Sequence, residues 1–317
     1  MVAALIAGFA GPARAATATD PTAQDERSDR VEDRDEALED AAAFKRQHEP
    51  AVVPSPAFEV RIDAPLYCDS NAQELQRGAS AALEGNPEAT FGWKHPIGSL
   101  PFTIGVQLAA NADRYANVAQ ADGDEATAKV QLQYYDRSDD QALAPFVWYQ
   151  GALMFDATFS PWTETEQDVA IGLEKTFNFT GGFHALPRSA QSAEHAVWNI
   201  GTELSVQRRW RTPGPDSTAL VAKLGVNWMP VAAWTVSVSA EAKRRWYEAL
   251  MLANRPVARR DFMIEPIMTL LWDSGVASFG SPQLAVQVAF DRQSSNAPGR
   301  SFSGWSIGPI LTVAWRF

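Results

Sequence analysis

The residues of this chain that could do chemistry are charged side chains in the polar rows of alternating segments in its second half. They face away from apolar residues in the intervening positions, and this period of two is typical of a strand with one polar and one apolar face. The acids are Glu174, Glu203, Glu241, Glu265 and Asp291, the bases are Arg209, Arg211, Lys223, Lys243 and Arg245, and Gln207 belongs to the same rows. Water on that face would let these groups act on charged solutes.

The histidines and the cysteine do not suggest catalysis or metal binding. His48 lies in an acidic stretch, His95 in a turn, and His184 and His195 in a long connection, so none is placed in a strand row beside a serine. Cys68 is the only cysteine, which permits no internal disulfide and disfavours zinc; we expect an unpaired thiol in a loop. The sequence has no phosphate-binding glycine pattern. We therefore expect no metal, no cofactor and no enzymatic activity, with lipid hydrolysis as a less favoured alternative.

Twelve segments between Phe58 and Phe317 alternate in this way, which predicts an all-β fold. The composition, 46% hydrophobic and 21% charged, would suit a soluble protein. It also suits a transmembrane barrel, because only alternate residues of each strand meet lipid. One segment, 146–159, predicts a strand without predicting its facing, since large apolar residues occupy both of its rows.

The last strand, from Ser303, carries the strongest signal. Its apolar row has tryptophan near both ends and consists of Trp305, Ile307, Pro309, Leu311, Val313, Trp315 and Phe317. A soluble β-sandwich is the less favoured alternative, because its strands seldom carry such a row. A terminal phenylalanine that closes an alternating strand resembles the signal by which Gram-negative outer-membrane β-barrels are recognised for assembly. The resemblance implies that Leu311, Val313, Trp315 and Phe317 form this signal.

The resemblance implies a transmembrane antiparallel up-and-down β-barrel of about twelve strands over residues 58–317, in the outer membrane. An even count places both termini in the periplasm. Turns at Pro96 and Pro230 then fall on the periplasmic side, and the long links 67–87 and 247–260 fall outside. The connection 180–195 is long for a periplasmic turn, which leaves ten, twelve or fourteen strands open.

A weaker resemblance joins the Arg259–Phe262 stretch and the stretch 291–296 to the barrel of surface lipoprotein assembly modifiers. Those proteins carry helical repeats before the barrel, and the roughly 40 residues between Ala16 and Phe58 are too few for repeats of about 34 residues each. We therefore take this likeness as common barrel architecture.

The N-terminal part divides into two segments. Residues 1–15 end in Ala13-Arg14-Ala15, which predicts a signal peptide that is removed on export. Residues 16–57 are predicted to be an acidic periplasmic segment and linker, since 20–50 holds eleven acids against five bases. This segment is either disordered or a short helix, and a docking helix or a plug for the pore is the more specific alternative.

The charged rows leave two functions open. If the lumen holds water, separate acidic and basic walls would steer charged solutes, and the protein is a channel for diffusion or uptake of small hydrophilic solutes. If the charges pair across the wall, the barrel is closed and acts as a scaffold or export partner. Expected partners are outer-membrane lipid, the barrel assembly machinery and small solutes, without nucleic acid; the oligomeric state stays open. Arg208 and Arg244 fall on the lipid-facing row and are expected at the membrane rim.

Overall fold

The computed structural model describes residue 34 and residues 58–72, 80–118, 122–134, 142–180, 197–231, 233–248, 250–252, 255–274 and 282–317. Its first strands are β1 (Phe58–Asp69), β2 (Ala82–Gly85), β3 (Glu88–Pro96), β4 (Phe102–Tyr115), β5 (Gly123–Tyr134), β6 (Ala144–Phe155), β7 (Trp162–Thr180) and β8 (Val197–Thr212). The remaining strands are β9 (Ser217–Val231), β10 (Trp234–Tyr247), β11 (Leu250–Leu252), β12 (Arg255–Val257), β13 (Arg260–Asp273), β14 (Gln283–Ser295) and β15 (Phe302–Arg316).

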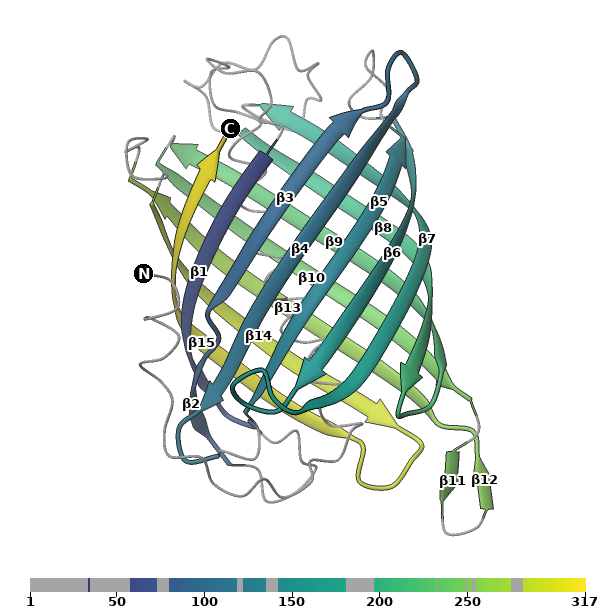
Figure 1. Ribbon diagram of the computed structural model, residues 1–317. Helices are drawn as coiled ribbons and strands as arrows, with labels where there is room; N and C mark the ends of the chain where they lie inside the picture. The colour runs from purple at the N-terminus through teal and green to yellow at the C-terminus, as the bar shows by residue number, and fades with distance from the viewer. Residues whose placement is uncertain are drawn as a thin grey trace.

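The strands form one closed antiparallel barrel (Figure 1). From β4 to β10 and from β13 to β15 each strand pairs with the next one along the chain, and β10 pairs with β13. The last strand, β15, returns to pair with β1 from Glu59 opposite Arg316 to Asp69 opposite Ser306. The short β2 and β3 share one place between β1 and β4, and β11 and β12 form a separate hairpin, so the wall has twelve strands. Closure leaves no unpaired sheet edge, as a wall in lipid requires. The all-β barrel and its count of twelve are confirmed.

The outer face is apolar and is bordered by tryptophan at both ends. Ten of the eleven tryptophans lie on outward rows. Those near the end that holds Phe317 are Trp93, Trp198, Trp228, Trp234, Trp272 and Trp315, and those near the other end are Trp162, Trp210, Trp246 and Trp305. On β15 the two belts are ten residues apart, or ~33 Å of strand. At a tilt of about 40° this spans ~25 Å, the height of the apolar band of a membrane barrel.

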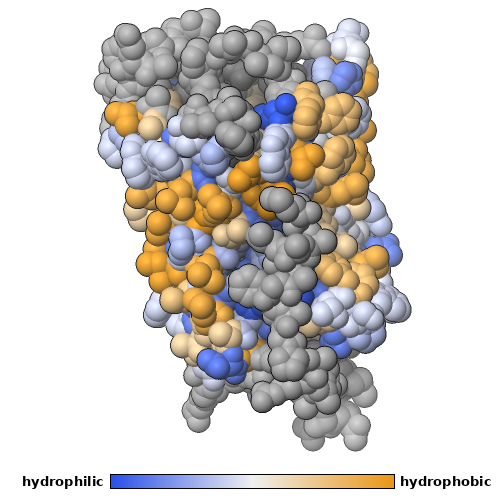
Figure 2. Space-filling model, turned by 60° about the vertical axis from the view of Figure 1, so that its left-hand side comes forward, coloured by the Kyte–Doolittle hydropathy of each residue, from blue (hydrophilic) through white to orange (hydrophobic). Residues whose placement is uncertain are grey.

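Figure 2 shows apolar side chains gathered over the middle of the wall, with hydrophilic residues more frequent toward its ends. No helix among the described residues is long and apolar enough to cross a bilayer.

The connections lie at the predicted ends of the barrel, but their lengths follow the expected asymmetry only in part. The turns 97–101 and 232–233 lie at the end that holds Phe58 and Phe317, and the links 70–81 and 248–259 lie at the other end, as expected. The connections 135–143, 181–196 and 274–282 are also at the first end, however, so its turns are not uniformly short. The connection 181–196 does not change the strand count, because β7 and β8 are direct neighbours and Thr180 pairs with Val197.

Two local expectations are settled by the strand faces. In β6 the inward row contains Phe146 and Trp148, and a cluster with Ala170 on β7 buries both rings. Gly172 makes room for this packing, since a Cβ there would lie 2.5 Å from Cζ of Phe146. The prediction of Cys68 in a loop is wrong: it lies within β1, exposed on the outer face, because the strand continues three residues beyond Leu66.

The signal peptide predicted for 1–15 and the acidic segment 16–57 lie outside the described residues, with the exception of Arg34. Arg34 has helical backbone and is buried.

Candidate functional site

The candidate site is the polar inner face of the barrel. All eleven positions selected from the sequence lie on inward rows. Those buried inside the barrel are Arg209, Arg211, Glu241, Lys243, Arg245, Glu265 and Asp291, and those partly exposed are Glu174, Glu203, Gln207 and Lys223. The alternation of each strand positions them, because the residues immediately before and after each of them point to the lipid-facing side.

Strand register brings five of these residues into one row across the wall. Glu174 on β7 is opposite Glu203 on β8, Glu203 is opposite Lys223 on β9, Lys223 is opposite Glu241 on β10, and Glu241 is opposite Glu265 on β13. We call these five residues the acidic row. Its four carboxylates and one ammonium sum to a formal charge of −3. The geometry therefore gathers negative charge along one row of the inner face.

A second row nearer the Phe317 end is polar but uncharged. The same pairings bring together Asn178, Asn199, Asn227, Ser237, Thr269 and Gln287. Within it, Nδ2 of Asn227 donates to Oδ1 of Asn199 at 3.0 Å, and Nε2 of Gln287 donates to Oγ1 of Thr269 at 3.2 Å. Amides and hydroxyls both donate and accept hydrogen bonds, so this row can replace part of a solute's hydration shell.

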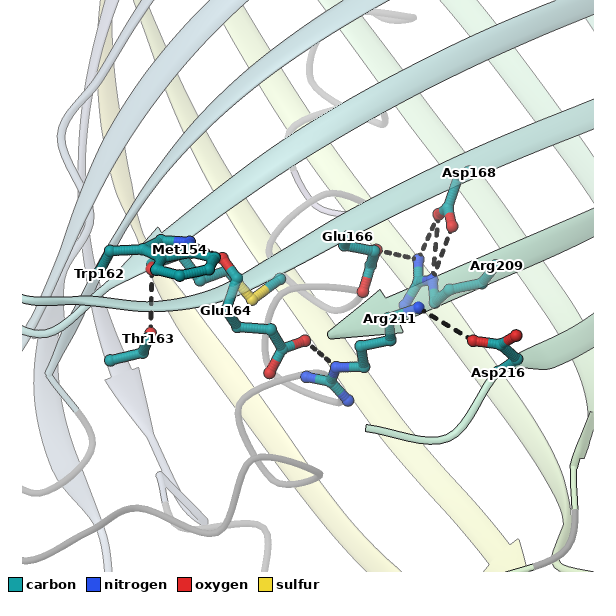
Figure 3. Close-up of polar contacts among 9 residues, drawn as sticks. All are labelled: Met154, Trp162, Thr163, Glu164, Glu166, Asp168, Arg209, Arg211 and Asp216. Carbon is teal, nitrogen blue, oxygen red and sulfur yellow. Dashed lines mark hydrogen bonds and ion pairs between the residues drawn. The ribbon is translucent and has the colours of Figure 1, made fainter. Parts of the chain in front are cut away.

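A network of buried ion pairs joins β7 and β8 toward the opposite end (Figure 3). Nε of Arg209 lies 3.0 Å from both carboxylate oxygens of Asp168, and Nη2 lies 2.8 Å from Oε1 of Glu166. Arg211 pairs with Glu164 on the neighbouring level. These side chains are at most 7% exposed, so the charges satisfy one another within the wall.

Lysines are paired in the same way on β9 and β10. Nζ of Lys243 lies 2.9 Å from Oε1 of Glu241, and Nζ of Lys223 lies 3.2 Å from Oε2 of the same carboxylate. The idea of separate acidic and basic walls is therefore wrong for Arg209, Arg211, Lys223 and Lys243, each of which has a carboxylate on its own or the adjacent strand. Antiparallel register decides this for Arg209 and Lys223, which lie directly across from Asp168 and Glu241.

The sequence analysis missed several interior residues. Glu164 and Glu166 continue the two-residue period of Asp168 toward the start of β7, so extending that pattern by four residues would have found them. Glu84 lies on the four-residue strand β2, which is too short for an alternating pattern to identify. Arg34 precedes every strand and has no sequence signal of a lumenal position.

The outward arginines fit the expected rim. Arg208 donates to Glu248 at 2.5 Å and lies 3.5 Å from Asp216, both beyond strand ends. Arg244 is three residues from the end of β10, with its guanidinium 5.6 Å from the ring centre of Trp246. Both charges therefore lie beside the aromatic belt, where charge costs little.

The assembly residues Leu311, Val313 and Trp315 lie on the outward row of β15. Phe317 follows them and exchanges two backbone hydrogen bonds with Phe58, at 3.0 and 3.3 Å. The last residue thus pairs with the first described strand.

The described part of the chain contains one of the four histidines. Its histidine, His95, is exposed at the end of β3 and stacks on Trp93 at 5.8 Å between ring centres. His48, His184 and His195 lie outside the described residues. Within the described ranges, no three histidine, cysteine or acidic side chains are close enough together to hold a metal ion.

The closed wall, its polar interior and its two tryptophan belts together decide where the chain resides. The chain is an outer-membrane β-barrel. No known protein family matches its sequence, and no curated protein does either.

Solved structures with a similar course of the chain are outer-membrane proteins of different kinds. An outer membrane channel from Pseudomonas putida F1 matches with 10% identity and a TM-score of 0.49, over 84% of this chain and 99% of that one. The translocator domain of the autotransporter NalP from Neisseria meningitidis matches with 10% identity and a TM-score of 0.40, over 92% and 98%. LpxR from Salmonella typhimurium matches with 7% identity and a TM-score of 0.38, over 80% and 99%. Likenesses this distant carry no information on activity.

Proposed function

We propose that the protein is a channel through which small hydrophilic solutes cross the outer membrane. The observation that supports it is the presence of two polar rows, the acidic row and the uncharged row, on the inner face of one closed wall. A solute that leaves bulk water would meet carboxylates and then amides, which can substitute for its hydration shell. Because the acidic row has excess negative charge, the channel favours cations and zwitterions over anions.

The alternative of a closed barrel that acts as a scaffold or export partner has one observation in its favour. The pairs of Arg209 with Asp168 and of Lys243 with Glu241 link neighbouring inward side chains. In a channel, such pairs would hold the side chains against the wall and leave the lumen open. In a scaffold, the same paired side chains would fill the lumen. Solute flux therefore separates the two functions.

Proteoliposome swelling tests the proposal. Vesicles that contain the refolded chain are placed in isotonic solutions of a neutral pentose, a cationic amino acid and an anionic sugar acid. We expect swelling with the pentose, faster swelling with the cation than with the anion, and none in empty vesicles. Protein-containing vesicles that match empty ones for all three solutes would contradict a channel and favour the scaffold.

The proposal includes no catalytic role, and the barrel assembly machinery is the proposed partner that recognises the C-terminal strand. Purified protein should leave phospholipid and lipopolysaccharide intact. Hydrolysis that is lost in His95→Ala, His184→Ala or His195→Ala would instead support an enzyme.

A further inference from the structure

One residue of the N-terminal segment, Arg34, contacts inward-facing side chains of the barrel wall. Between residues 1 and 57 the structure describes Arg34 alone, and its side chain is 1% exposed. Nη2 of Arg34 lies 2.6 Å from Oε1 of Glu84, and Nη1 lies 3.2 Å from Oε2, so the guanidinium binds the carboxylate through two nitrogens. Nη1 also lies 3.4 Å from Oγ of Ser306.

The remaining contacts complete a site around this guanidinium. Its central carbon lies 4.4 Å from the ring centre of Tyr67, within the range of a cation–π interaction. The Tyr67 hydroxyl donates to Oε1 of Gln287 at 2.9 Å, and Nε2 of Gln287 donates to the backbone oxygen of Arg34 at 2.9 Å. Tyr67, Glu84, Gln287 and Ser306 are each at most 2% exposed.

The barrel itself places these four residues. They come from β1, β2, β14 and β15, which are adjacent where the barrel closes, and all four lie on inward rows. Ser306 is paired with Asp69, two residues from Tyr67, and Gln287 is paired with Gly308, two residues from Ser306. The four residues of the site therefore belong to the wall, and Arg34 is the described residue of the N-terminal segment that contacts them.

The chemistry of the site suits a guanidinium better than an ammonium. A carboxylate accepts the parallel N–H groups of a planar guanidinium in two hydrogen bonds, and an aromatic face stacks on its plane. An ammonium is a compact charge that cannot make both contacts in this geometry. If Arg34 left, Glu84 would be a buried carboxylate without its cation, which favours entry of another cation of the same shape.

We propose that Tyr67, Glu84, Gln287 and Ser306 form a guanidinium-binding site in the lumen, which Arg34 occupies as a tethered ligand in competition with guanidinium-bearing solutes. The inference rests on the proposed channel and names the class of solute that it recognises. Arginine-like cations would displace Arg34 from Glu84 and take up the same contacts.

Chemical rescue of Arg34→Ala in a planar bilayer tests the site. The variant of the full chain should conduct more than the wild type, because the tethered cation is gone. Methylguanidinium should then reduce this current in a saturable manner, with a half-blocking concentration about tenfold below that of methylammonium. Glu84→Gln in the same background should abolish this preference. Arg27→Ala, which removes a charge elsewhere in the N-terminal segment, is the matched control and should conduct like the wild type.

A binding measurement separates failure of the site from failure of the channel. If no variant conducts, the channel is refuted, and the site is tested by thermal unfolding of Arg34→Ala in detergent. A melting temperature raised by methylguanidinium but not by methylammonium, and only with Glu84 intact, would support the site without a channel. Equal effects of the two cations, or an effect retained in Glu84→Gln, would overturn it. If Arg34→Ala does not fold, Arg34→Lys, which keeps the charge without the planar fork, takes its place; because a tethered ammonium remains, only the preference for methylguanidinium over methylammonium and its loss with Glu84→Gln decide the result.

Discussion

Gly308 shows how a single residue controls closure of the barrel. It lies on the inward row of β15 beside β1, and a Cβ at this position would be 2.8 Å from Cα of Tyr67 and closer still to the carbonyl oxygen of Leu66. Both neighbours are backbone atoms, which cannot rotate away. The seam between the first and last strands therefore needs glycine here.

We expect Gly308→Ala to lower the free energy of unfolding by about 1–3 kcal/mol, the usual cost of overpacking. The measurement is urea unfolding followed by heat-modifiable gel mobility. Gly201→Ala is the control, because a Cβ at that inward position of β8 meets nothing within 4 Å. Equal unfolding midpoints for the two variants would show that the seam tolerates a side chain.

Arg209 provides a second test among single residues. Arg209→Met leaves Asp168 and Glu166 as buried carboxylates without their cation, so we expect a loss of about 3–5 kcal/mol in unfolding free energy. Arg244→Met removes the same charge from the lipid-facing rim, and we expect a change below about 1 kcal/mol. Urea unfolding of both variants measures the difference, and a cost for Arg209→Met no larger than that for Arg244→Met would contradict the importance of the network.

Deletion of Phe317 tests the assembly signal. The deletion removes the terminal aromatic ring and two backbone hydrogen bonds to Phe58. We expect less folded barrel in cells than in detergent refolding, because recognition is lost as well as pairing. Heat-modifiable mobility of both preparations measures this, and an undiminished yield in cells would argue against a signal at Phe317.

At the scale of the strands, alternation in the sequence was enough to predict the existence and facing of most elements. β13 illustrates this, because every second residue from Asp261 to Asp273 is buried. β6 could not be assigned, since the volume that receives Phe146 and Trp148 is provided by Gly172 and Ala170 on another strand. The partners of each charge could not be predicted either, because they depend on register between strands, which alternation alone does not specify.

The acidic row makes a prediction at this scale. We expect a combined Glu203→Gln and Glu265→Gln variant to lose cation preference, since two of the four carboxylates of the row become neutral. The reversal potential in a potassium chloride gradient should move at least about halfway to zero. Glu248→Gln is the control, because Glu248 is exposed beyond the end of β10. A reversal potential unchanged in the double variant would show that selectivity arises elsewhere.

At the scale of the whole molecule, two features of the sequence predicted the class of protein. The apolar outward rows and the ten outward tryptophans require lipid around the wall, and both are visible as a period of two. The position of Arg34 could not be predicted, because it depends on a site assembled from β1 and β2 at one end of the sequence and β14 and β15 at the other. The plug alternative for residues 16–57 stays a prediction that truncation of this segment tests.

Single-channel conductance in a planar bilayer tests the central claim, with the full chain compared with a variant that lacks residues 16–57. Circular dichroism and heat-modifiable mobility first establish that both are folded barrels. We predict a steady, cation-selective current from the full chain and a larger one from the truncated variant, because Arg34 no longer occupies the lumen. Silence from both folded proteins would contradict a channel and leave the closed scaffold as the function of this barrel.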